Sequence, residues 1–402
     1  MHILVINPGS SSIKFSMFEE DGTELHSLYE GELSGVGTAE AKLKFLDAAG
    51  TDLAPQTGEV AAATMEQAID VVERAVCLPG LPDVNAVGYR VVHPGPHLRG
   101  HQAVTPELLN RLREAISFAP LHNPKDVRMI EEMQRRLPDV PHFVCFDAVF
   151  HETMPEQSTV YALPQQVRDA GVRRYGFHGL SCESVVLRFR GAGILPARLI
   201  IAHLGSGCSV TTCVDGKSME NSMGLTPTGG VVMGTRPGDL DPGVVVFLLR
   251  RSGATLDSVQ EMLNRDAGLR ALGGVNDMRE LRARAGAGDA QASLAIAVFC
   301  RSVVKIIAGY VALYGADALV FTGGIGEHDS ASRAEIVHGL SVFGVVLDEV
   351  ANVARGGERL KKVSRPESRI AVYVAEAEED LMIARHVAGM CCKSQNLDEI
   401  EA

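Results

Sequence analysis

The chain has 402 residues, of which 46% are hydrophobic and 22% charged, and it contains no tryptophan. This composition is typical of a globular protein with a large core, and the length favours two domains. The formal net charge of −12 argues against nucleic acid or an anionic membrane surface as a partner, because both require clustered Lys and Arg, and we expect neither.

The first residues lead directly into alternating apolar positions, without the basic and long apolar regions of a signal peptide. The most apolar later segment, "ASLAIAVFCRSVVKIIAGYVALYG", carries Arg301 and Lys305 in its middle and predicts a buried helix, not a membrane span. The eight cysteines are scattered without a C-x-x-C pair. We therefore expect reduced thiols and a cytoplasmic location.

Predicted strands and helices alternate along most of the chain, which favours a layered α/β fold. The opening "ILVINPGSSSIKFSMFEEDG" predicts a hairpin of strands 3–8 and 12–18 closed by a Gly-Ser turn. The segments "AVGYRVVH" and "HFVCFD" predict strands, and Arg90, His93 and Asp147 lie at their carboxyl ends, where α/β sheets bind ligands. Three helices are predicted in this part of the chain, over 65–76, 106–118 and 125–136.

The middle of the chain repeats the pattern of the opening. Residues 199–216, "LIIAHLGSGCSVTTCVDG", form an apolar strand, a Gly-Ser turn, a second strand and an Asp-Gly turn, as the first hairpin does. Such a repeat predicts a duplicated domain. A third small-residue turn follows the buried strand of "ALVFTGGIGEH", residues 318–328, and opens a predicted helix.

These three turns are candidates for phosphate binding, because converging backbone N–H groups form a cavity for phosphate oxygens and small residues let the anion approach. One such hairpin alone is more often a polar surface turn. Two matched hairpins and a GGxG turn favour phosphates held between two duplicated domains. The spacings of the Walker loop and of the dinucleotide-binding fingerprint are absent from the sequence.

Five further residues have the chemistry to handle charge: Arg90, His122, Asp147, His178 and Arg236. Arginine presents a rigid fork that suits carboxylate and phosphate oxygens, and phosphoryl transfer depends mainly on positioning and charge neutralisation. Taken singly, each residue also has a structural interpretation, as a salt-bridge partner or a hydrogen-bond donor. Asp241 followed by Pro242 is better explained as the start of a helix.

The complete chain resembles the acetate kinase family. The resemblance rests on ten motifs in the family's order: "NPGSSSIKF", "RVVH", "APLHNP", "FDAVFHETMP", "RRYGFHG", "HLGSG", "MGTRPGDLDPG", "NDMRE", "FTGGIGE" and "EEDLMIAR". It implies an α/β fold of two duplicated ribonuclease-H-like domains, as in actin-like ATPases, with a nucleotide cleft between them. We expect the first domain to comprise 1–150 with about 380–402, and the second, which carries the adenosine site, to comprise 151–379.

The resemblance also implies an activity, namely reversible phosphoryl transfer from ATP to acetate, giving ADP and acetyl phosphate, with Mg²⁺ or alternatively Mn²⁺. It further implies a homodimer. Two alternatives remain open: a propionate kinase, against which the branched Val92 argues, and a non-enzymatic nucleotide switch like the chaperone ATPases, which leaves the charged residues without a role. A carboxylate acceptor is already ionised at neutral pH, so we expect direct in-line transfer.

Roles carry over from the resemblance residue by residue. Asp147 would be the catalytic carboxylate, Arg90 and Arg236 would bind the acid and the migrating phosphoryl group, and His178 with His122 would donate to its oxygens. The predicted apolar pocket for the acid consists of Val92, Leu121, Phe177 and Pro227. The predicted magnesium ligands are Asn7 and Glu379. The predicted nucleotide contacts are Ser10, Ser12, Lys14, His203, Leu204, Gly205, Ser206, Gly207, Asp277, Met278, Arg279, Gly324, Ile325, Gly326, Glu327 and His328.

Several positions inside these motifs depart from the family pattern. They are Tyr89 and Cys182 in place of His, Pro94 in place of Gly, Ser206 and His328 in place of Asn, and Gly229 in place of an acidic residue. The departures at Ser206 and His328 predict an altered nucleotide rim and leave the preferred phosphoryl donor open.

Overall fold

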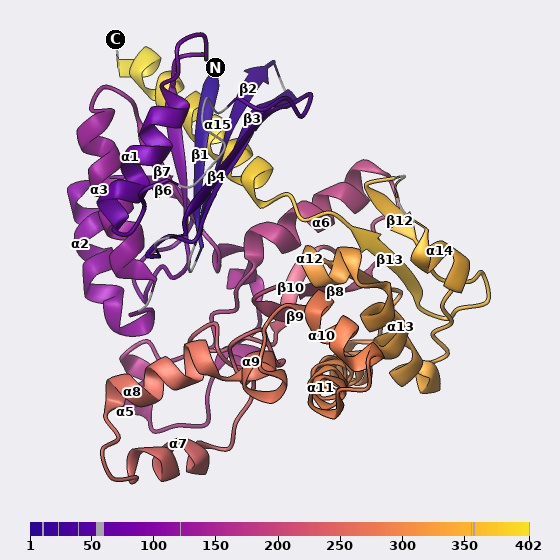
Figure 1. Ribbon diagram of the computed structural model, residues 1–402. Helices are drawn as coiled ribbons and strands as arrows, with labels where there is room; N and C mark the ends of the chain where they lie inside the picture. Colours follow the sequence, from indigo (N-terminus) through magenta and orange to yellow (C-terminus); the bar gives the residue numbers. More distant parts are fainter. Residues whose placement is uncertain are drawn as a thin grey trace. The chain divides into compact units, whose positions relative to one another are not determined.

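The computed structural model describes residues 1–9, 12–22, 24–38, 40–53, 60–120, 122–354, 356 and 358–401. It divides the chain into two compact units (Figure 1). Unit 1 comprises Met1–Val149 and Glu378–Ala402, and unit 2 comprises Phe150–Ala377.

Unit 1 contains a seven-stranded sheet in the order β4-β3-β2-β1-β5-β7-β6. Strands β1 to β4 are antiparallel neighbours, whereas β5 and β7 run parallel to β1. The strands are β1 (His2–Pro8), β2 (Ser12–Asp21), β3 (Glu24–Ser34), β4 (Lys42–Asp47), β5 (Ala86–Val91), β6 (Gln102–Ala103) and β7 (His142–Phe146). The predicted opening hairpin and the two predicted site strands are confirmed.

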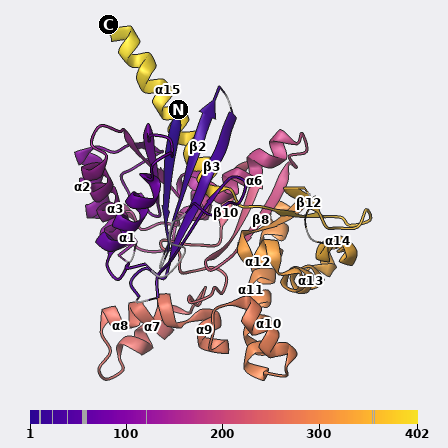
Figure 2. The same ribbon diagram turned by 45° about the horizontal axis from the view of Figure 1, so that its top comes forward.

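The two faces of this sheet are covered by different helices (Figure 2). One face packs into a core with α1 (Met65–Val76), α2 (Pro106–Glu114) and α3 (Asn123–Arg136). The C-terminal helix α15 (Glu379–Glu401) contacts β1, β2, β3, β5 and β7. The predicted helix starts follow from local chemistry, since Thr64 forms a capping box with Gln67.

Gly88 explains how α15 can lie so close to β5. A methyl group on Gly88 would lie 2.7 Å from Cγ2 of both Ile383 and Val387, so only a residue without a side chain fits there. Alternate residues of a strand face the same side, which puts Gly88 and Arg90 on the face that α15 covers. Docking of the helix at Gly88 therefore carries the first residues of α15 toward Arg90.

Unit 2 contains a six-stranded sheet in the order β10-β9-β8-β11-β13-β12. Three antiparallel strands are followed by two strands parallel to β8, which is the order seen around β1 in unit 1. This shared order confirms the duplication predicted from the hairpin repeat. The strands are β8 (Arg198–Leu204), β9 (Cys208–Val214), β10 (Lys217–Asn221), β11 (Ala318–Thr322), β12 (Leu360–Lys362) and β13 (Ala371–Ala375).

The helices of unit 2 surround its sheet and form an extension that precedes the long helix. They are α4 (Glu156–Thr159), α5 (Gln165–Asp169), α6 (Gly179–Gly191), α7 (Pro242–Leu249), α8 (Leu256–Glu261), α9 (Gly268–Gly273), α10 (Met278–Gly286), α11 (Ala290–Tyr314), α12 (Gly323–His328), α13 (Ser330–Gly339) and α14 (Glu349–Val353). Helix α6 supplies Val185 and Phe189 to a core shared with β8 and β11. Asp241 caps α7 as predicted, accepting a hydrogen bond from the Gly243 amide.

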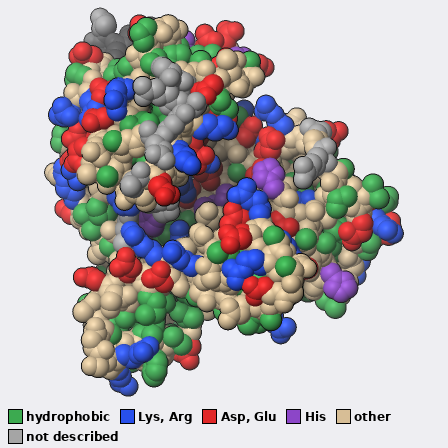
Figure 3. All heavy atoms as spheres, in the orientation of Figure 1, with side chains coloured by type: hydrophobic (Ala, Val, Ile, Leu, Met, Phe, Trp, Pro, Cys, Tyr) green, Lys and Arg blue, Asp and Glu red, His purple; other side chains and the backbone are tan. Residues whose placement is uncertain are grey.

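Helix α11 is the predicted buried helix. Among the described residues it alone is long and apolar enough to cross a membrane by length and composition. It packs against α9, α10, α13, β8 and β9, and Phe299 and Val303 are fully buried. The core helix of a globular unit has the same composition, and α11 occupies such a position. Figure 3 shows further apolar side chains on the surface over α7 and α8, where Phe247 and Leu256 are exposed.

Candidate active site

The site in unit 1 lies where β1, β5 and β7 end and α15 begins. Asn7 is near the end of β1, Arg90 near the end of β5, and Asp147 follows β7 directly. Glu379 is the first residue of α15. The carboxyl ends of parallel strands meet at one edge of the sheet, so three residues far apart in the sequence become neighbours.

Arg90 is the centre of this cluster. Its Nη2 donates to Asp147 Oδ2 at 2.8 Å, its Nη1 lies 3.4 Å from Asn7 Oδ1, and its Nε lies 3.9 Å from Glu379 Oε2. The Asp147 side chain is 1% exposed and that of Arg90 14%. Burial opposes the charged guanidinium, but Asp147 and Glu379 outweigh it and raise the pKa of Arg90 above its usual value. The structure thus holds a permanent positive charge at this edge.

Asn7 joins the strand to the helix. Its Nδ2 donates to Asp380 Oδ1 at 2.9 Å and to Glu379 Oε2 at 3.2 Å. Ser16 Oγ donates to the other Asp380 oxygen at 2.5 Å. The cluster therefore presents the Asn7 amide oxygen and the Glu379 carboxylate, hard oxygen ligands of the kind that Mg²⁺ prefers in proteins, so these two residues fit a magnesium site.

Lys14 lies opposite Asn7 in the register of β1 and β2, and therefore points to the same face of the sheet. Lys14, Ser16 and Asp380 line a small cavity of about 170 Å³. The predicted phosphate contact Lys14 is thus next to the predicted metal ligands. Ser12 begins β2, whereas Ser10 lies outside the described residues.

The segment after β5 carries the predicted acid-pocket residue Val92, which is buried. The first turn of α3 holds its backbone: Val92 N donates to Asp126 Oδ2 at 3.4 Å, and Asn123 Nδ2 donates to His93 O at 3.1 Å. Burial raises the pKa of Asp126 to about 7. His122 is the N-cap residue of α3 and therefore adjoins this turn, whereas Leu121 lies outside the described residues.

In unit 2, His178 and His203 form a stacked pair with ring centroids 4.1 Å apart. Ser209 Oγ contacts His178 Nδ1 at 2.9 Å, and Ser181 Oγ contacts His203 Nδ1 at 2.8 Å, so a serine orients each ring. His178 has φ +60°, a left-handed conformation that is uncommon for residues with a side chain. The predicted site residue is therefore held at some cost in backbone strain.

Arg236 and His178 converge on the second hairpin. A methyl group on Gly207 would lie 3.2 Å from His178 Nε2 and 3.5 Å from Arg236 Nη1. Arg236 Nη1 also donates to Pro227 O at 2.8 Å. A side chain at this position would occupy the space beside the imidazole and the guanidinium. Two donors that converge beside a glycine turn are suited to phosphate oxygens.

The GGxG turn lies beside the same hairpin. A methyl group on Gly323, which has φ +75°, would lie 2.9 Å from Leu204 O and 3.1 Å from His203 Nε2. The Glu327 carboxylate accepts hydrogen bonds from the amides of Gly323 and Ala377. Glu327 therefore braces the turn through its side chain, so any contact with the nucleotide must come from its remaining atoms. Gly324 and His328 are exposed.

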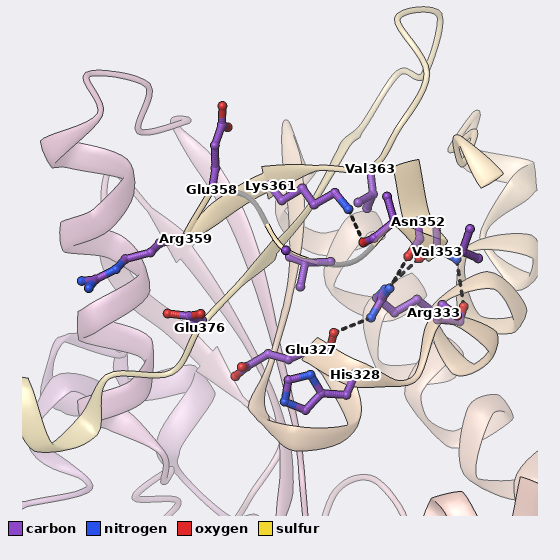
Figure 4. Close-up of a pocket in the computed structure, with 14 residues that line it drawn as sticks. Glu327, His328, Arg333, Asn352, Val353, Glu358, Arg359, Lys361, Val363 and Glu376 are labelled. Carbon is purple, nitrogen blue, oxygen red and sulfur yellow. Dashed lines mark hydrogen bonds between the residues drawn. The ribbon is translucent and has the colours of Figure 1, made fainter. Parts of the chain in front are cut away.

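A pocket of about 740 Å³ begins at Glu327 and His328 and extends toward β12 and β13 (Figure 4). Figure 4 shows Arg333 between Glu327 and Asn352, with dashed lines joining it to both. The Arg333 guanidinium donates to the carbonyls of Gly326, Glu327 and Asn352, and is buried. The pocket thus has a rigid base, whereas His328 at its rim is exposed.

The "NDMR" segment, residues 276–279, lies near the second hairpin turn, residues 203–207. Gly234 N donates to Ser206 O at 3.2 Å, and Asn276 Cβ lies close to Gly234. Asp277 caps α10 and pairs with Arg279, whose hydrogen bonds lower the pKa of Asp277 to about 2. The Met278 side chain is buried in the core, so only its backbone is available to a ligand.

Two departures from the family pattern prove to be structural. Tyr89 Oη donates to His142 Nδ1 at 2.7 Å, while His142 Nε2 donates to Leu137 O, so this pair completes a buried hydrogen-bond chain. Cys182 is fully buried and lies 3.4 Å from Thr211 Oγ1. Neither side chain belongs to the clusters around Arg90 and His178.

Sequence reasoning missed the residues that orient the predicted ones: Ser16, Asp126, Ser181, Ser209 and Asp380. Their signals are weak, because serine and aspartate in strands and helices have many roles. Strand alternation does place Ser16 on the same face as Lys14, and Asp380 directly follows Glu379 in the sequence. These two relations point to Ser16 and to Asp380, which also lies in the motif "EEDLMIAR".

Comparison with known proteins decides the family. A model of the acetokinase family matches residues 2–385. The chain belongs to the acetokinase family. It is 37% identical over 391 residues to an acetate kinase of Geobacillus kaustophilus, covering 96% of this chain and 98% of that protein. As a member of this family it is a phosphotransferase, and the interpretation as a non-enzymatic switch is excluded.

Two solved structures of kinases have the same fold. The acetate kinase of Porphyromonas gingivalis matches with a TM-score of 0.84 and 32% identity, and a propionate kinase of Francisella tularensis with 0.88 and 34%. Each match covers 97% of this chain and 99% of the other. The predicted α/β fold of the actin-like ATPase type is confirmed.

Proposed function

We propose that this chain is an acetate kinase that transfers a phosphoryl group reversibly between ATP and acetate by direct in-line attack. The observation that carries the proposal is the buried pair of Arg90 and Asp147, with Asn7 and Glu379 beside it. A short carboxylic acid needs a cation to bind it and no strong base to activate it, because it is ionised at neutral pH.

In this proposal Arg90 binds the substrate carboxylate. Asp147 holds the guanidinium through Nη2, and this leaves the fork with a defined orientation at the end of β5. Asp147 also aligns the acid for attack, and its negative charge limits how tightly Arg90 retains the product. Val92, whose backbone is held by α3, contributes to the pocket for the methyl group, with Leu121, Phe177 and Pro227 as further proposed members.

The cluster in unit 2 would act on the phosphates. The backbone amides of the 203–207 hairpin and the donors His178 and Arg236 converge at Gly207, which supports a role in neutralising the transferred phosphoryl group. We place His122 among the donors on the acid side. The adenosine part would lie against 277–279 and 324–328, with Ser10, Ser12 and Lys14 on the phosphates.

Asn7 and Glu379 would hold Mg²⁺, because their side chains are hydrogen-bonded neighbours and each carries an oxygen of the kind that suits this ion. When bound, the ion neutralises charge on the phosphate oxygens of the nucleotide. Mn²⁺ has similar ligand preferences and is the proposed substitute.

Acetate is the proposed acid, and propionate is the alternative. The likeness to the propionate kinase of Francisella tularensis is compatible with either acid. A hydrophobic pocket separates acids that differ by one methylene by only about 1–3 kcal/mol, so we expect turnover of both with a preference for acetate. The branched side chain of Val92 favours the smaller acid.

The remaining proposals concern organisation. We propose that unit 1 and unit 2 are the two ribonuclease-H-like domains, that the protein acts in the cytoplasm, and that it is a homodimer. The exposed apolar side chains Phe247 and Leu256, together with Leu294 and Leu313 on α11, support a further protein contact.

The experiment is a hydroxamate assay with ATP and Mg²⁺ and a panel of acetate, propionate and butyrate. We expect ATP consumption that depends on the acid, a trapped acyl hydroxamate, and the highest kcat/KM with acetate. Hydrolysis of ATP that is independent of acid, with no hydroxamate, would refute the proposed function. A higher kcat/KM with propionate would establish the alternative.

A further inference from the structure

We propose that Asp380, held by Ser16, is a positioning residue that sets the orientation of the Asn7 amide and so keeps Asn7 Oδ1 turned away from the two carboxylates and available to the proposed metal. The inference deepens the proposed function, on which it rests for the identity of Asn7 and Glu379 as metal ligands. Asp380 itself would contact neither metal nor substrate.

The hydrogen bonds leave the Asn7 amide one orientation. An amide nitrogen carries two hydrogens, and both are used, one toward Asp380 Oδ1 at 2.9 Å and one toward Glu379 Oε2 at 3.2 Å. The amide oxygen then lies on the Arg90 side, 3.4 Å from Nη1. In the reversed amide the oxygen would face two carboxylates, whose oxygens repel it, and the nitrogen would face a guanidinium. The observed orientation therefore turns the amide oxygen toward the positive charge of Arg90, and this oxygen is the atom that Asn7 would offer to the proposed metal.

Glu379 alone could not hold this orientation in the working enzyme. As a proposed metal ligand, its carboxylate turns part of its lone pairs toward the ion, which weakens its bond to Asn7. Asp380 is not a proposed metal ligand, and protein donors hold both of its oxygens, Asn7 at Oδ1 and Ser16 at Oδ2 at 2.5 Å. Asp380 is therefore the anchor that persists when metal binds.

The three residues of this hydrogen-bonded group, Asn7, Ser16 and Asp380, come from three separate elements. Asn7 is on β1, Ser16 is on the neighbouring β2, and Asp380 is in the first turn of α15, where the helix dipole favours a negative charge. Docking of α15 at Gly88 brings the third element to the first two. Hydrogen-bond partners that orient metal ligands in this manner typically contribute 10- to 100-fold to metal affinity.

The test measures Mn²⁺ binding to the full-length protein with ADP by electron paramagnetic resonance of free Mn²⁺, alongside kcat and KM. Asp380→Asn presents an amide that can donate to Asn7 Oδ1, which favours the reversed orientation. We expect about tenfold weaker Mn²⁺ binding and a matching rise in the KM for Mg²⁺. Ser16→Ala should weaken binding about two- to threefold, and it serves if Asp380→Asn does not fold.

A further variant separates positioning from a general structural effect. Asp21→Asn on the exposed end of β2 is the matched control and should bind Mn²⁺ normally. Wild-type Mn²⁺ affinity in Asp380→Asn, or in Ser16→Ala where Asp380→Asn does not fold, would overturn the inference.

The outcomes also distinguish this inference from the proposed function. Metal binding does not require the acid substrate, so weaker Mn²⁺ binding in Asp380→Asn supports the positioning role even if no acyl hydroxamate forms. Normal acetate-dependent turnover with unchanged Mn²⁺ binding in Asp380→Asn would leave the proposed function standing and refute the role of Asp380.

Discussion

Replacing Arg90 with methionine tests the most buried ion pair of the site. Methionine fills a similar volume but leaves the Asp147 carboxylate, which is 1% exposed, without its guanidinium partner. Breaking a buried pair from one side costs about 3–5 kcal/mol, because the remaining charge is uncompensated. We expect Arg90→Met to lower the free energy of unfolding by about 3 kcal/mol, the lower end of this range, because the Arg90 side chain is 14% exposed.

Asp147→Asn should cost less, about 1–2 kcal/mol, because a neutral amide remains and Arg90 keeps Glu379 nearby. The double variant should be more stable than the sum of the two single losses predicts, by about 2 kcal/mol, because neither charge is then left alone. All three variants should lose kcat by orders of magnitude, since both residues are proposed to act on the acid.

The assay is thermal unfolding of the wild type and the three variants, with hydrogen exchange on β5 and β7 to locate the change. A domain of about 150–250 residues loses about 2–4 °C per kcal/mol, so Arg90→Met should lower the Tm of unit 1 by roughly 10 °C. If the losses of stability in the two single variants add up to the loss in the double variant, the coupling between Arg90 and Asp147 is refuted. A Tm of Arg90→Met equal to that of the wild type would refute the buried pair itself.

Two further predictions concern the surroundings of the site. Gly88→Ala places a methyl group 2.7 Å from Ile383 and Val387, and overpacking of this kind destabilises a protein by about 1–3 kcal/mol. We expect α15 to detach more often and to be cleaved faster by a protease. An unchanged cleavage rate would contradict the close approach of α15 to β5. Burial raises the pKa of Asp126 from 3.8 to about 7, so Asp126 keeps its proton to a higher pH in the folded protein than in the unfolded chain. Its contribution to folding stability is therefore full below about pH 4 and is lost as the pH rises through about 7. Asp126→Asn should therefore show a smaller fall in Tm between pH 5 and 8 than the wild type, and an equal fall would exclude Asp126 as its source.

Much of the site was predictable because its residues sit at ends of elements with strong local signals. Hydrophobic pattern and turn residues alone predict the hairpin motif, the buried strand before Asp147 and the glycine turn of 323–326. The orienting residues were not predictable in this way. Ser16 and Asp380 are 364 residues apart, and no local pattern relates a serine in an alternating strand to the start of a terminal helix.

Glu327 and Met278 show that a motif can predict a residue correctly without predicting which of its atoms is available to a ligand. Both stand in motifs of the nucleotide site, but the Glu327 carboxylate braces the GGxG turn and the Met278 side chain is buried. A motif states which residues recur together, and it does not state which atoms of each residue face a ligand. That distinction depends on the neighbours that burial and hydrogen bonding bring to each side chain.

The sequence by itself determined the elements, the duplication and the family, because hydrophobic period, turn residues and repeated motifs are local properties that survive without knowledge of contacts. Only the tertiary structure decided how charge is arranged at the site. It placed α15 on the sheet through the missing side chain of Gly88, and so assembled Arg90, Asn7 and two carboxylates from opposite ends of the chain. The physical reason is that a buried charge is tolerated only where partners converge, and convergence is a property of packing.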